Sequence, residues 1–386
     1  MKKNSSFCEN SNMQELRYFD NAATTKICDA ALKSYIDTSL NYPGNPSSKH
    51  SEGLKAKKKL DETRQGFANI LKTKPEQLFF TSGASEAISI VLSSLLWLKR
   101  PGRVIFSAIE HEAVLSFAPI LKEKGFDVVI LKSKGGHVKP EDLENAINQD
   151  TKLIAIQAVN NVVGTINDIK ALVKVVRKKE TEINRKIFFF SDCVQALGKI
   201  PLNLTDLDVD GASFSSHKIH GPRGIGLLYL KRGDIQAIAK AGGQEKGVRG
   251  GTENLPAIVS FLTALECYEK DSSRVMSINH KLRNMFIENN IKVLSPENDI
   301  TGYVLTITTP LPSEVLTRML SDEGYEVSSG SACSNNAKGK SENVIIALGY
   351  SPSDAKGTIR ISFAPESDEE EAVKLAKLII NKVKEF

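Results

Sequence analysis

Between about residues 50 and 230 of this 386-residue chain, short apolar runs alternate with longer amphipathic stretches. The runs are rich in β-branched and aromatic residues, and nearly all are continuous, which is typical of parallel strands covered on both faces. Seven strands are predicted, at residues 77–81, 103–106, 128–131, 153–157, 187–192, 211–215 and 226–230.

Helical periodicity fills the intervals between these strands. The predicted helices span residues 51–71, 85–98, 112–123, 141–148 and 168–179. Each is long enough for a crossover, so the pattern predicts an α/β fold with a mainly parallel seven-stranded sheet. After about residue 255 the pattern changes to a long helix at 256–289, strands at 292–294 and 302–308, and a last helix opened by a capping box at 367–370. This part predicts a smaller α+β domain.

Composition narrows the functional classes. The net charge of +5 comes from 51 basic and 46 acidic residues. This excess of basic residues is small for the length of the chain and does not indicate nucleic-acid binding. No signal peptide or membrane span is evident, so we expect a soluble intracellular protein. Five cysteines are scattered without paired spacing, which argues against a disulfide framework and predicts a reducing, cytoplasmic setting with no permanent metal.

Asp192 and Lys218 are the first candidates for chemistry. The apolar strand before Asp192 would deliver its carboxylate into a poorly solvated crevice, where a cationic partner is needed. The pyridinium nitrogen of pyridoxal phosphate is such a partner, and Lys218 would be its Schiff-base lysine. Gln195 could reach the phenolic oxygen of the ring. The alternatives are a helix cap at Asp192 and a surface lysine.

A phosphate site is predicted where residues 79–86 run from a strand through small residues into a helix, since free N–H groups around Gly83 would face an anion. The alternative is an ordinary turn with a serine cap. Ser215 and His217 flank Lys218 as further phosphate ligands, unless they only brace a turn. His111 follows a strand at the carboxyl edge of the sheet and could stack on a flat ring, unless it lies on the surface.

Two further residues suggest a substrate and a nucleophile. Cys333 lies in a small, polar loop that would leave its thiol accessible, whereas Cys267 sits in an apolar run and is expected to be structural. Arg360 alternates with apolar residues along a strand. It could bind a substrate carboxylate bidentately, or pair with an acidic side chain.

The ordered motifs resemble those of the pyridoxal-phosphate-dependent cysteine desulfurases of the class-V aminotransferase family, of the type that supplies sulfur for iron–sulfur clusters and tRNA thiolation. The resemblance covers nearly the whole chain after residue 17. It rests on residues 18–25, 44–48 with His50, 81–86, 110–112, 160–161, Asp192 with Gln195, 215–221, 249–254, 328–333 and 360–362.

The resemblance implies a fold-type-I transferase with a large domain at 22–260, a small domain at 261–386 carrying the catalytic cysteine loop, and an N-terminal segment at 1–21 joining the small domain. It makes Lys218 the Schiff-base lysine and proton carrier, and Cys333 the sulfur acceptor. The implied cofactor ligands are Asp192 on the ring nitrogen, His111 stacked on the ring, Gln195 on the phenolate, and Ala84, Ser85, Ser215 and His217 on the phosphate.

Further implications concern substrate and partners. Asn161 and Arg360 would bind the cysteine carboxylate. Thr252 would reach the phosphate of a neighbouring subunit, which implies a homodimer, and the extended loop at 335–341 resembles the long-loop subgroup that passes sulfur to a scaffold protein. The expected products are L-alanine and a persulfide on Cys333.

Three positions depart from the family pattern: Val162, Cys193 and Ala364. Val162 places the network around Asn161 in question, and Cys193 is a candidate second reactive thiol. Two kinds of rival function remain open. One is another class-V reaction, by an aminotransferase or selenocysteine lyase in which Cys333 is incidental. The other is a non-catalytic sulfur-relay or scaffold-binding protein.

Overall fold

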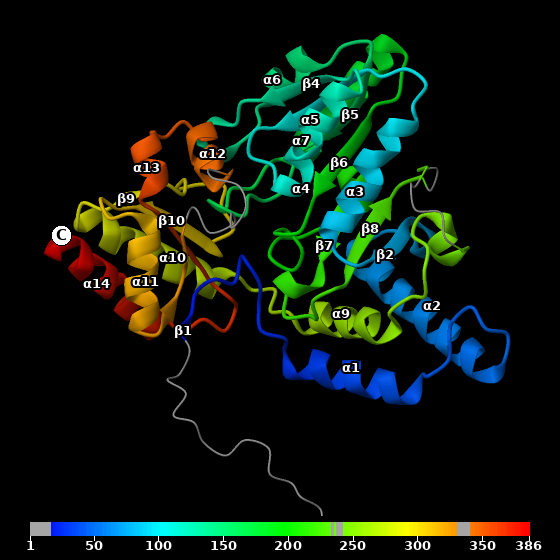
Figure 1. Cartoon of the computed structure of the whole chain (residues 1–386), viewed down its shortest axis with the longest axis horizontal. Coiled ribbons are helices and arrows are strands. Elements are labelled where there is room, and N and C mark those ends of the chain that lie inside the picture. Colours follow the sequence, from blue (N-terminus) through cyan, green and yellow to red (C-terminus); the bar gives the residue numbers. More distant parts are fainter. Residues whose placement is uncertain (1–16, 233–234, 237–241, 330–339) are drawn as a thin grey trace, which may run out of the picture.

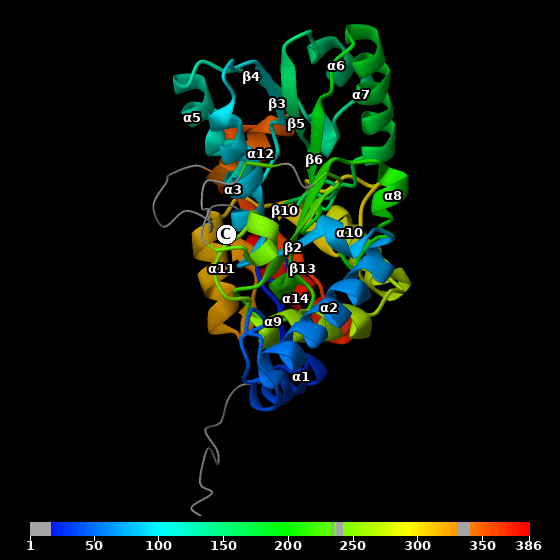
Figure 2. The same ribbon diagram turned by 90° about the vertical axis from the view of Figure 1, so that its right-hand side faces the viewer.

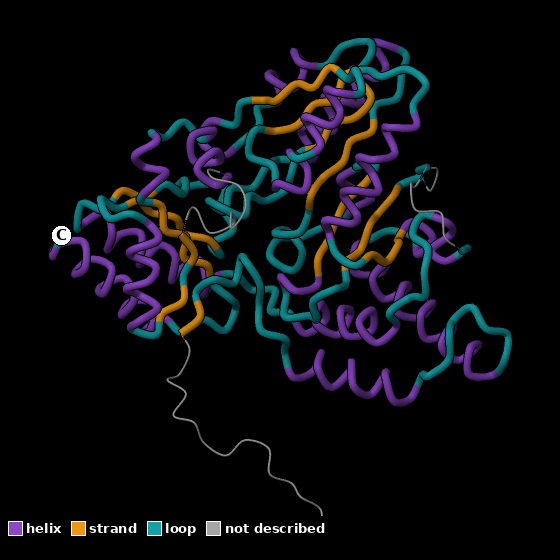
Figure 3. The backbone as a smooth tube through the Cα atoms, in the orientation of Figure 1, coloured by secondary structure: helices purple, strands orange, loops and turns teal. Residues whose placement is uncertain are grey.

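The largest sheet has seven strands in the order β2-β8-β7-β6-β5-β3-β4. Figure 1 labels most of its strands, and Figure 3 shows strands in orange among purple helices. This sheet belongs to a computed structural model that describes residues 17–232, 235–236, 242–329 and 340–386. The strands are β2 (Leu78–Thr81), β3 (Arg103–Ser107), β4 (Asp127–Leu131), β5 (Thr151–Ala155), β6 (Phe188–Asp192), β7 (Gly211–Ser215) and β8 (Gly226–Leu230). All seven predicted strands are present, with ends that shift by at most two residues.

The sheet is mainly parallel, as predicted. Within this described sheet, β8 is the one strand that runs antiparallel to its neighbours β7 and β2. The connection explains this reversal, because a parallel pair needs a crossover of about a dozen residues or more, and only the segment 216–225 joins β7 to β8.

Alternate side chains of the strands enter two apolar layers. Phe79 and Phe190 face one layer, and their sequence neighbours Phe80 and Phe189 face the other. The first layer is covered by α3 (Ala84–Ser94), α4 (Glu112–Leu115) and α5 (Phe117–Glu123). The second is covered by α2 (Ser51–Leu71), α6 (Pro140–Ala146), α7 (Ile169–Ile183) and α9 (Leu255–Cys267), and α1 (Asp29–Asn41) packs on α9 (Figure 2).

A second sheet has four strands in the order β12-β13-β10-β9. They are β9 (Lys292–Val293), β10 (Val304–Thr308), β12 (Ser328–Ser329) and β13 (Thr358–Ser362), accompanied by α10 (Ser273–Glu288), α11 (Ser313–Asp322), α12 (Lys340–Ala347), α13 (Pro352–Lys356) and α14 (Glu369–Glu385). The segment after β1 (Arg17–Tyr18) bridges β13 through Asp20 and Ser362, and β1 itself pairs with β11 (Tyr325–Glu326). The expected boundary at 260/261 falls inside α9, and the division into domains stays a prediction.

Three local predictions were wrong. The long helix at 256–289 is two helices, α9 and α10, because Tyr268 leaves the helical conformation and buries its ring against Tyr303. The helix at 112–123 is likewise interrupted, at Ser116. The cap of α14 is Asp368, whose side chain accepts from the Glu371 N–H, rather than the first residue of the expected capping box.

Cys267 is also corrected, because it is exposed at the end of α9 despite its apolar sequence context. Ala264 and Leu265 face the core, whereas the helix turns Glu266 and Cys267 outward. In the part of the chain that the structure describes, we find no helix with the length and apolar character needed to cross a bilayer.

Candidate active site

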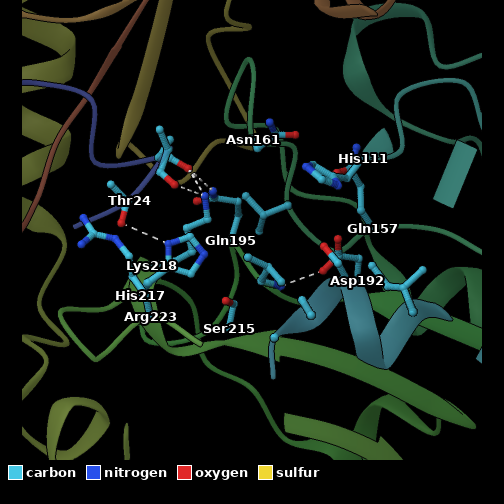
Figure 4. A pocket seen from close by; sticks show the side chains of 18 of the residues that line it. Thr24, His111, Gln157, Asn161, Asp192, Gln195, Ser215, His217, Lys218 and Arg223 are labelled. Carbon is cyan, nitrogen blue, oxygen red and sulfur yellow. Dashed lines mark hydrogen bonds between the residues drawn. The ribbon is translucent and has the colours of Figure 1, made fainter. Parts of the chain in front are cut away.

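A cavity of about 610 Å³ opens at the carboxyl ends of the parallel strands (Figure 4). Residues of the large sheet line it together with Asp20, Ser328 and Arg360, which come from the N-terminal segment and the four-stranded sheet. The structure brings ten of the predicted site residues together here: Ala84, Ser85, His111, Asn161, Asp192, Gln195, Ser215, His217, Lys218 and Arg360. Gln157 and Arg223 also line the cavity, and sequence reasoning missed both.

Lys218 ends a 3₁₀ turn that directly follows β7. Its Nζ donates to the carbonyl oxygen of Ala22 at 2.7 Å and to that of Ala23. Thr25 holds the turn from the same segment, because its N–H and Oγ1 both donate to the His217 carbonyl, at 2.8 and 3.0 Å. The N-terminal segment therefore positions the Lys218 side chain.

Asp192 is a buried carboxylate at the end of β6, on the opposite side of the cavity from Lys218 (Figure 4). Its Oδ1 accepts from the Val194 N–H and the Ser213 hydroxyl, both at 3.0 Å. Burial raises the pKa of Asp192, and electrostatic interactions with His111 and Lys218 oppose that rise. A cationic ring nitrogen would favour the ionised carboxylate in the same way.

His111 lies between β3 and α4, above Asp192 in Figure 4. Its Nδ1 accepts from the Ala113 N–H at 3.1 Å, which fixes the ring at the start of α4. Burial lowers the pKa of His111, and Lys218 adds to this effect. The lowered pKa favours the neutral form of the imidazole, and its flat ring is suited to stacking.

The first turn of α3 forms an anion cradle. The N-cap is Gly83, so the alternative of a turn capped by a serine side chain is wrong, and the first N–H groups of the helix, at Ala84 and Ser85, have no side-chain cap. The backbone of β8 approaches so closely that a Cβ on Gly226 would lie 2.6 Å from the Gly83 Cα. Nearby, the pKa of His217 is lowered to about 4 by burial and by Lys218, so this side chain is neutral.

Arg360 forms the ion pair with an acidic side chain that was one of its two predicted alternatives, whereas its binding of a substrate carboxylate stays a prediction. It lines the cavity from β13, and its Nη2 donates to Asp20 Oδ1 at 2.7 Å. Its Nη1 donates to the Asn161 carbonyl at 3.1 Å, and its buried Nε has no recorded partner among the described residues. Asp20 orients this arginine. A signal for Asp20 was present, because it lies within the matched motif at 18–25.

Two predicted residues, Thr252 and Cys333, are not among these ten. Thr252 does not line the cavity, and its Oγ1 accepts from Asn45 Nδ2 at 3.4 Å. Cys333 lies outside the described residues. Cys193 is a correction: its thiol is fully buried and its pKa is raised to about 12, so it cannot serve as a reactive thiol.

The network around Asn161 tolerates Val162. Asn160 Oδ1 accepts from the N–H groups of Val162 and Val163, both at 2.8 Å, and closes the turn. The Val162 side chain packs in an apolar cluster with Ile109 and Ile345. Within the described ranges, no three His, Cys, Asp or Glu side chains form a cluster able to hold a metal ion.

Comparisons agree with this geometry. The aminotransferase class-V family profile matches residues 17–375. The chain is 36% identical to a NifS/IcsS protein homolog of Lactobacillus delbrueckii subsp. bulgaricus, over 92% of this chain and 94% of that protein. It is 34% identical to a mitochondrial cysteine desulfurase of Eremothecium gossypii, over 95% of this chain and 76% of that protein.

Solved structures are similar along almost the whole chain. A NifS-like protein superposes with a TM-score of 0.87 at 33% identity, covering 96% of this chain and 100% of that one. SspA in complex with cysteine superposes with a TM-score of 0.79 at 31% identity, covering 90% of this chain and 99% of that one.

Proposed function

Because this chain belongs to the class-V aminotransferase family, whose enzymes use pyridoxal phosphate, we propose that it is a cysteine desulfurase that converts L-cysteine to L-alanine and leaves the sulfur on Cys333. The relatives named cysteine desulfurase and the cysteine-bound structure support this proposal. The observation that carries it is one cavity lined by the Lys218 amine, the buried Asp192 carboxylate and the His111 ring.

The residues present fit the cofactor. The buried Asp192 would hold the ring nitrogen, His111 would cover the ring, and Gln195 would contact the phenolic oxygen. The uncapped start of α3 is a cradle for the phosphate, with Ala84, Ser85, Ser215 and His217 as its ligands. When bound, pyridoxal phosphate supplies an aldehyde and an electron-withdrawing ring.

The protein's own groups would do the remaining work. Arg360 and Asn161 bind the substrate carboxylate, because the guanidinium is already oriented by Asp20. The Lys218 amine accepts the Cα proton and returns it. The Cys333 thiolate attacks the substrate sulfur, an S–S bond forms, and the Cβ–S bond breaks with its electron pair left on carbon. The substrate S–H proton stays on the outer sulfur of the persulfide, and the proton released when the Cys333 thiol ionises goes to that carbon and completes alanine.

Replacing Cys333 by serine tests the nucleophile. The variant should keep the visible absorbance of bound cofactor while losing alanine formation from cysteine. Full turnover in this variant would remove Cys333 from the mechanism, and keto-acid exchange without alanine would indicate another class-V reaction. Borohydride reduction followed by peptide mapping tests the other end of the site, and the cofactor label should be found on Lys218.

A homodimer is the second part of the proposal. Leu32, Ile36 and Leu40 recur every fourth residue of α1 with exposed side chains, and such a stripe is typical of an interface. Thr252 lies beside the chain that leaves α1, through its contact with Asn45, and this supports a role at a neighbouring subunit.

Sedimentation of Ile36→Glu tests the dimer. This variant should be monomeric and should bind the cofactor more weakly, whereas Ile287→Glu, at an exposed apolar position of α10, should stay dimeric. A dimeric Ile36→Glu protein would exclude the α1 face as the interface.

The sulfur acceptor is proposed to be a scaffold protein of iron–sulfur cluster assembly or a tRNA-thiolation factor, reached through the long loop after Cys333. We also place the enzyme in the cytoplasm, where the unpaired Cys28, Cys193 and Cys267 of the described chain would stay reduced. Radiolabelled cysteine sulfur should move from the purified enzyme to a co-purifying protein, and a Cys333→Ser enzyme should transfer none.

A further inference from the structure

A buried lysine lies behind the cavity and contacts one of its lining residues. Lys199 is only 7% exposed, and its Nζ donates to Gln195 Oε1 at 2.6 Å. Gln195 lines the cavity, and Lys199 is absent from the lining. Lys199 therefore acts on the site through Gln195 and not by touching substrate or cofactor.

The chemistry of lysine decides how the Gln195 amide is oriented. The ammonium group of Lys199 has hydrogen-bond donors and no acceptor, so the amide oxygen of Gln195 faces it, as the contact to Oε1 shows. The amide nitrogen then faces the other way and donates to the Ala22 carbonyl at 3.0 Å. That same carbonyl accepts from the Lys218 Nζ at 2.7 Å. A chain of hydrogen bonds thus joins Lys199 to the reactive lysine.

The surroundings of Lys199 are unfavourable for a charge. Burial, Lys218 and Arg360 together lower its pKa to about 7. The charge of Lys199 in turn lowers the pKa of His217 and opposes the rise in the pKa of His220. The ring of Tyr303 lies 5.6 Å from the Lys199 Nζ. Burying an amine among cations is costly, so a compensating role in the site is expected.

We propose that Lys199 is a positioning residue, which fixes the Gln195 amide with its nitrogen toward the site so that this nitrogen donates to the phenolic oxygen of the cofactor. The inference rests on the function proposed above, in which Gln195 contacts that oxygen. Without Lys199 the amide loses one of the two hydrogen bonds that orient it and keeps only the one to the Ala22 carbonyl, so it turns more readily and presents its own oxygen, which repels a phenolate. The ionised cofactor is then less stable.

The test is a pH titration of the visible absorbance of the bound cofactor, in the holoenzyme without substrate. Lys199→Met should raise the midpoint by about one pH unit, the size of one lost hydrogen bond. Lys57→Met, on the exposed face of α2, should leave the midpoint unchanged. Because no turnover is measured, a failure here is distinct from a failure of the proposed desulfuration.

A second variant shows whether Lys199 acts by positioning Gln195 or through a direct effect of its charge on the cofactor. In Gln195→Leu holoenzyme, adding Lys199→Met should produce no further shift, because the two residues act as one unit. An unshifted midpoint in Lys199→Met, or a full shift that persists in the Gln195→Leu background, would overturn the proposal. If Lys199→Met gives no folded holoenzyme, Lys199→Leu replaces it with the same expected shift.

Discussion

Arg360→Lys should weaken cysteine binding while leaving the chemical step nearly intact. In the structure the guanidinium is buried and held on two sides, by Asp20 Oδ1 at 2.7 Å and by the Asn161 carbonyl at 3.1 Å. A lysine keeps the charge and has one nitrogen in place of three. It therefore cannot keep both contacts and also grip a carboxylate through two parallel hydrogen bonds.

The loss is about one charge-assisted hydrogen bond to the substrate, worth about 1.5–3 kcal/mol. That corresponds to a decrease in kcat/KM of about 10- to 150-fold. The substrate carboxylate carries the same charge before and during the reaction, so Arg360 should bind the substrate and the transition state equally well. The decrease should therefore fall on KM, with kcat changed by less than about three-fold.

The assay is alanine formation over a range of L-cysteine concentrations. Arg185→Lys is a matched control, because Arg185 is an exposed arginine that pairs with Asp150 at 3.6 Å far from the cavity residues. An unchanged KM in Arg360→Lys would refute carboxylate binding by this residue. A large fall in kcat with KM retained would instead place Arg360 in the transition state.

Three further predictions concern a buried carboxyl group, the accessibility of two cysteines and a close backbone contact. Burial raises the pKa of Glu110 from 4.5 to about 8, so the folded chain keeps a proton that the unfolded chain loses, and stability falls as pH rises through this window. Glu110→Gln should remove this pH-dependent loss of stability. The denaturant midpoint of the variant should therefore rise relative to that of wild type as the pH increases. Iodoacetamide should alkylate the exposed Cys267 and spare Cys193 in the native protein, as read by peptide mass mapping. Gly226→Ala should weaken cofactor binding about ten-fold or more by crowding the start of α3, measured by cofactor titration, whereas Gly243→Ala, with open space around it, should not.

Each of these has an outcome that contradicts it. A pH-independent stability difference would show that Glu110 is ionised in the folded protein. Rapid alkylation of Cys193 would mean that the strand end around it opens. Unchanged cofactor affinity in Gly226→Ala would separate the contact between β8 and α3 from the phosphate site.

Local sequence patterns predicted most of the large sheet, because burial on both faces leaves a continuous apolar run at each strand. The same patterns failed at Tyr268 and Cys267. At Tyr268 the helix ends because its ring packs against Tyr303, which is distant in sequence. At Cys267 the apolar context could not tell which side of α9 faces solvent.

The candidate site divides in the same way. Asp192, Ser215 and Lys218 follow strands whose carboxyl ends meet at one edge, so parallel order along the chain predicts that they meet. No such rule predicts the contact between Asp20 and Arg360 or the one between Lys199 and Gln195. Asp20 reaches Arg360 across 340 positions of chain.

By itself, the sequence determined the order of strands and helices, the family resemblance and the identity of the groups gathered at the strand ends, because these follow from periodicity and from motifs of a few residues. Only the tertiary structure decided which polar group partners which, and whether a thiol such as Cys193 is buried beyond reach. Hydrogen-bond partners and local solvation depend on atoms brought together by packing, and no nearby residue encodes them.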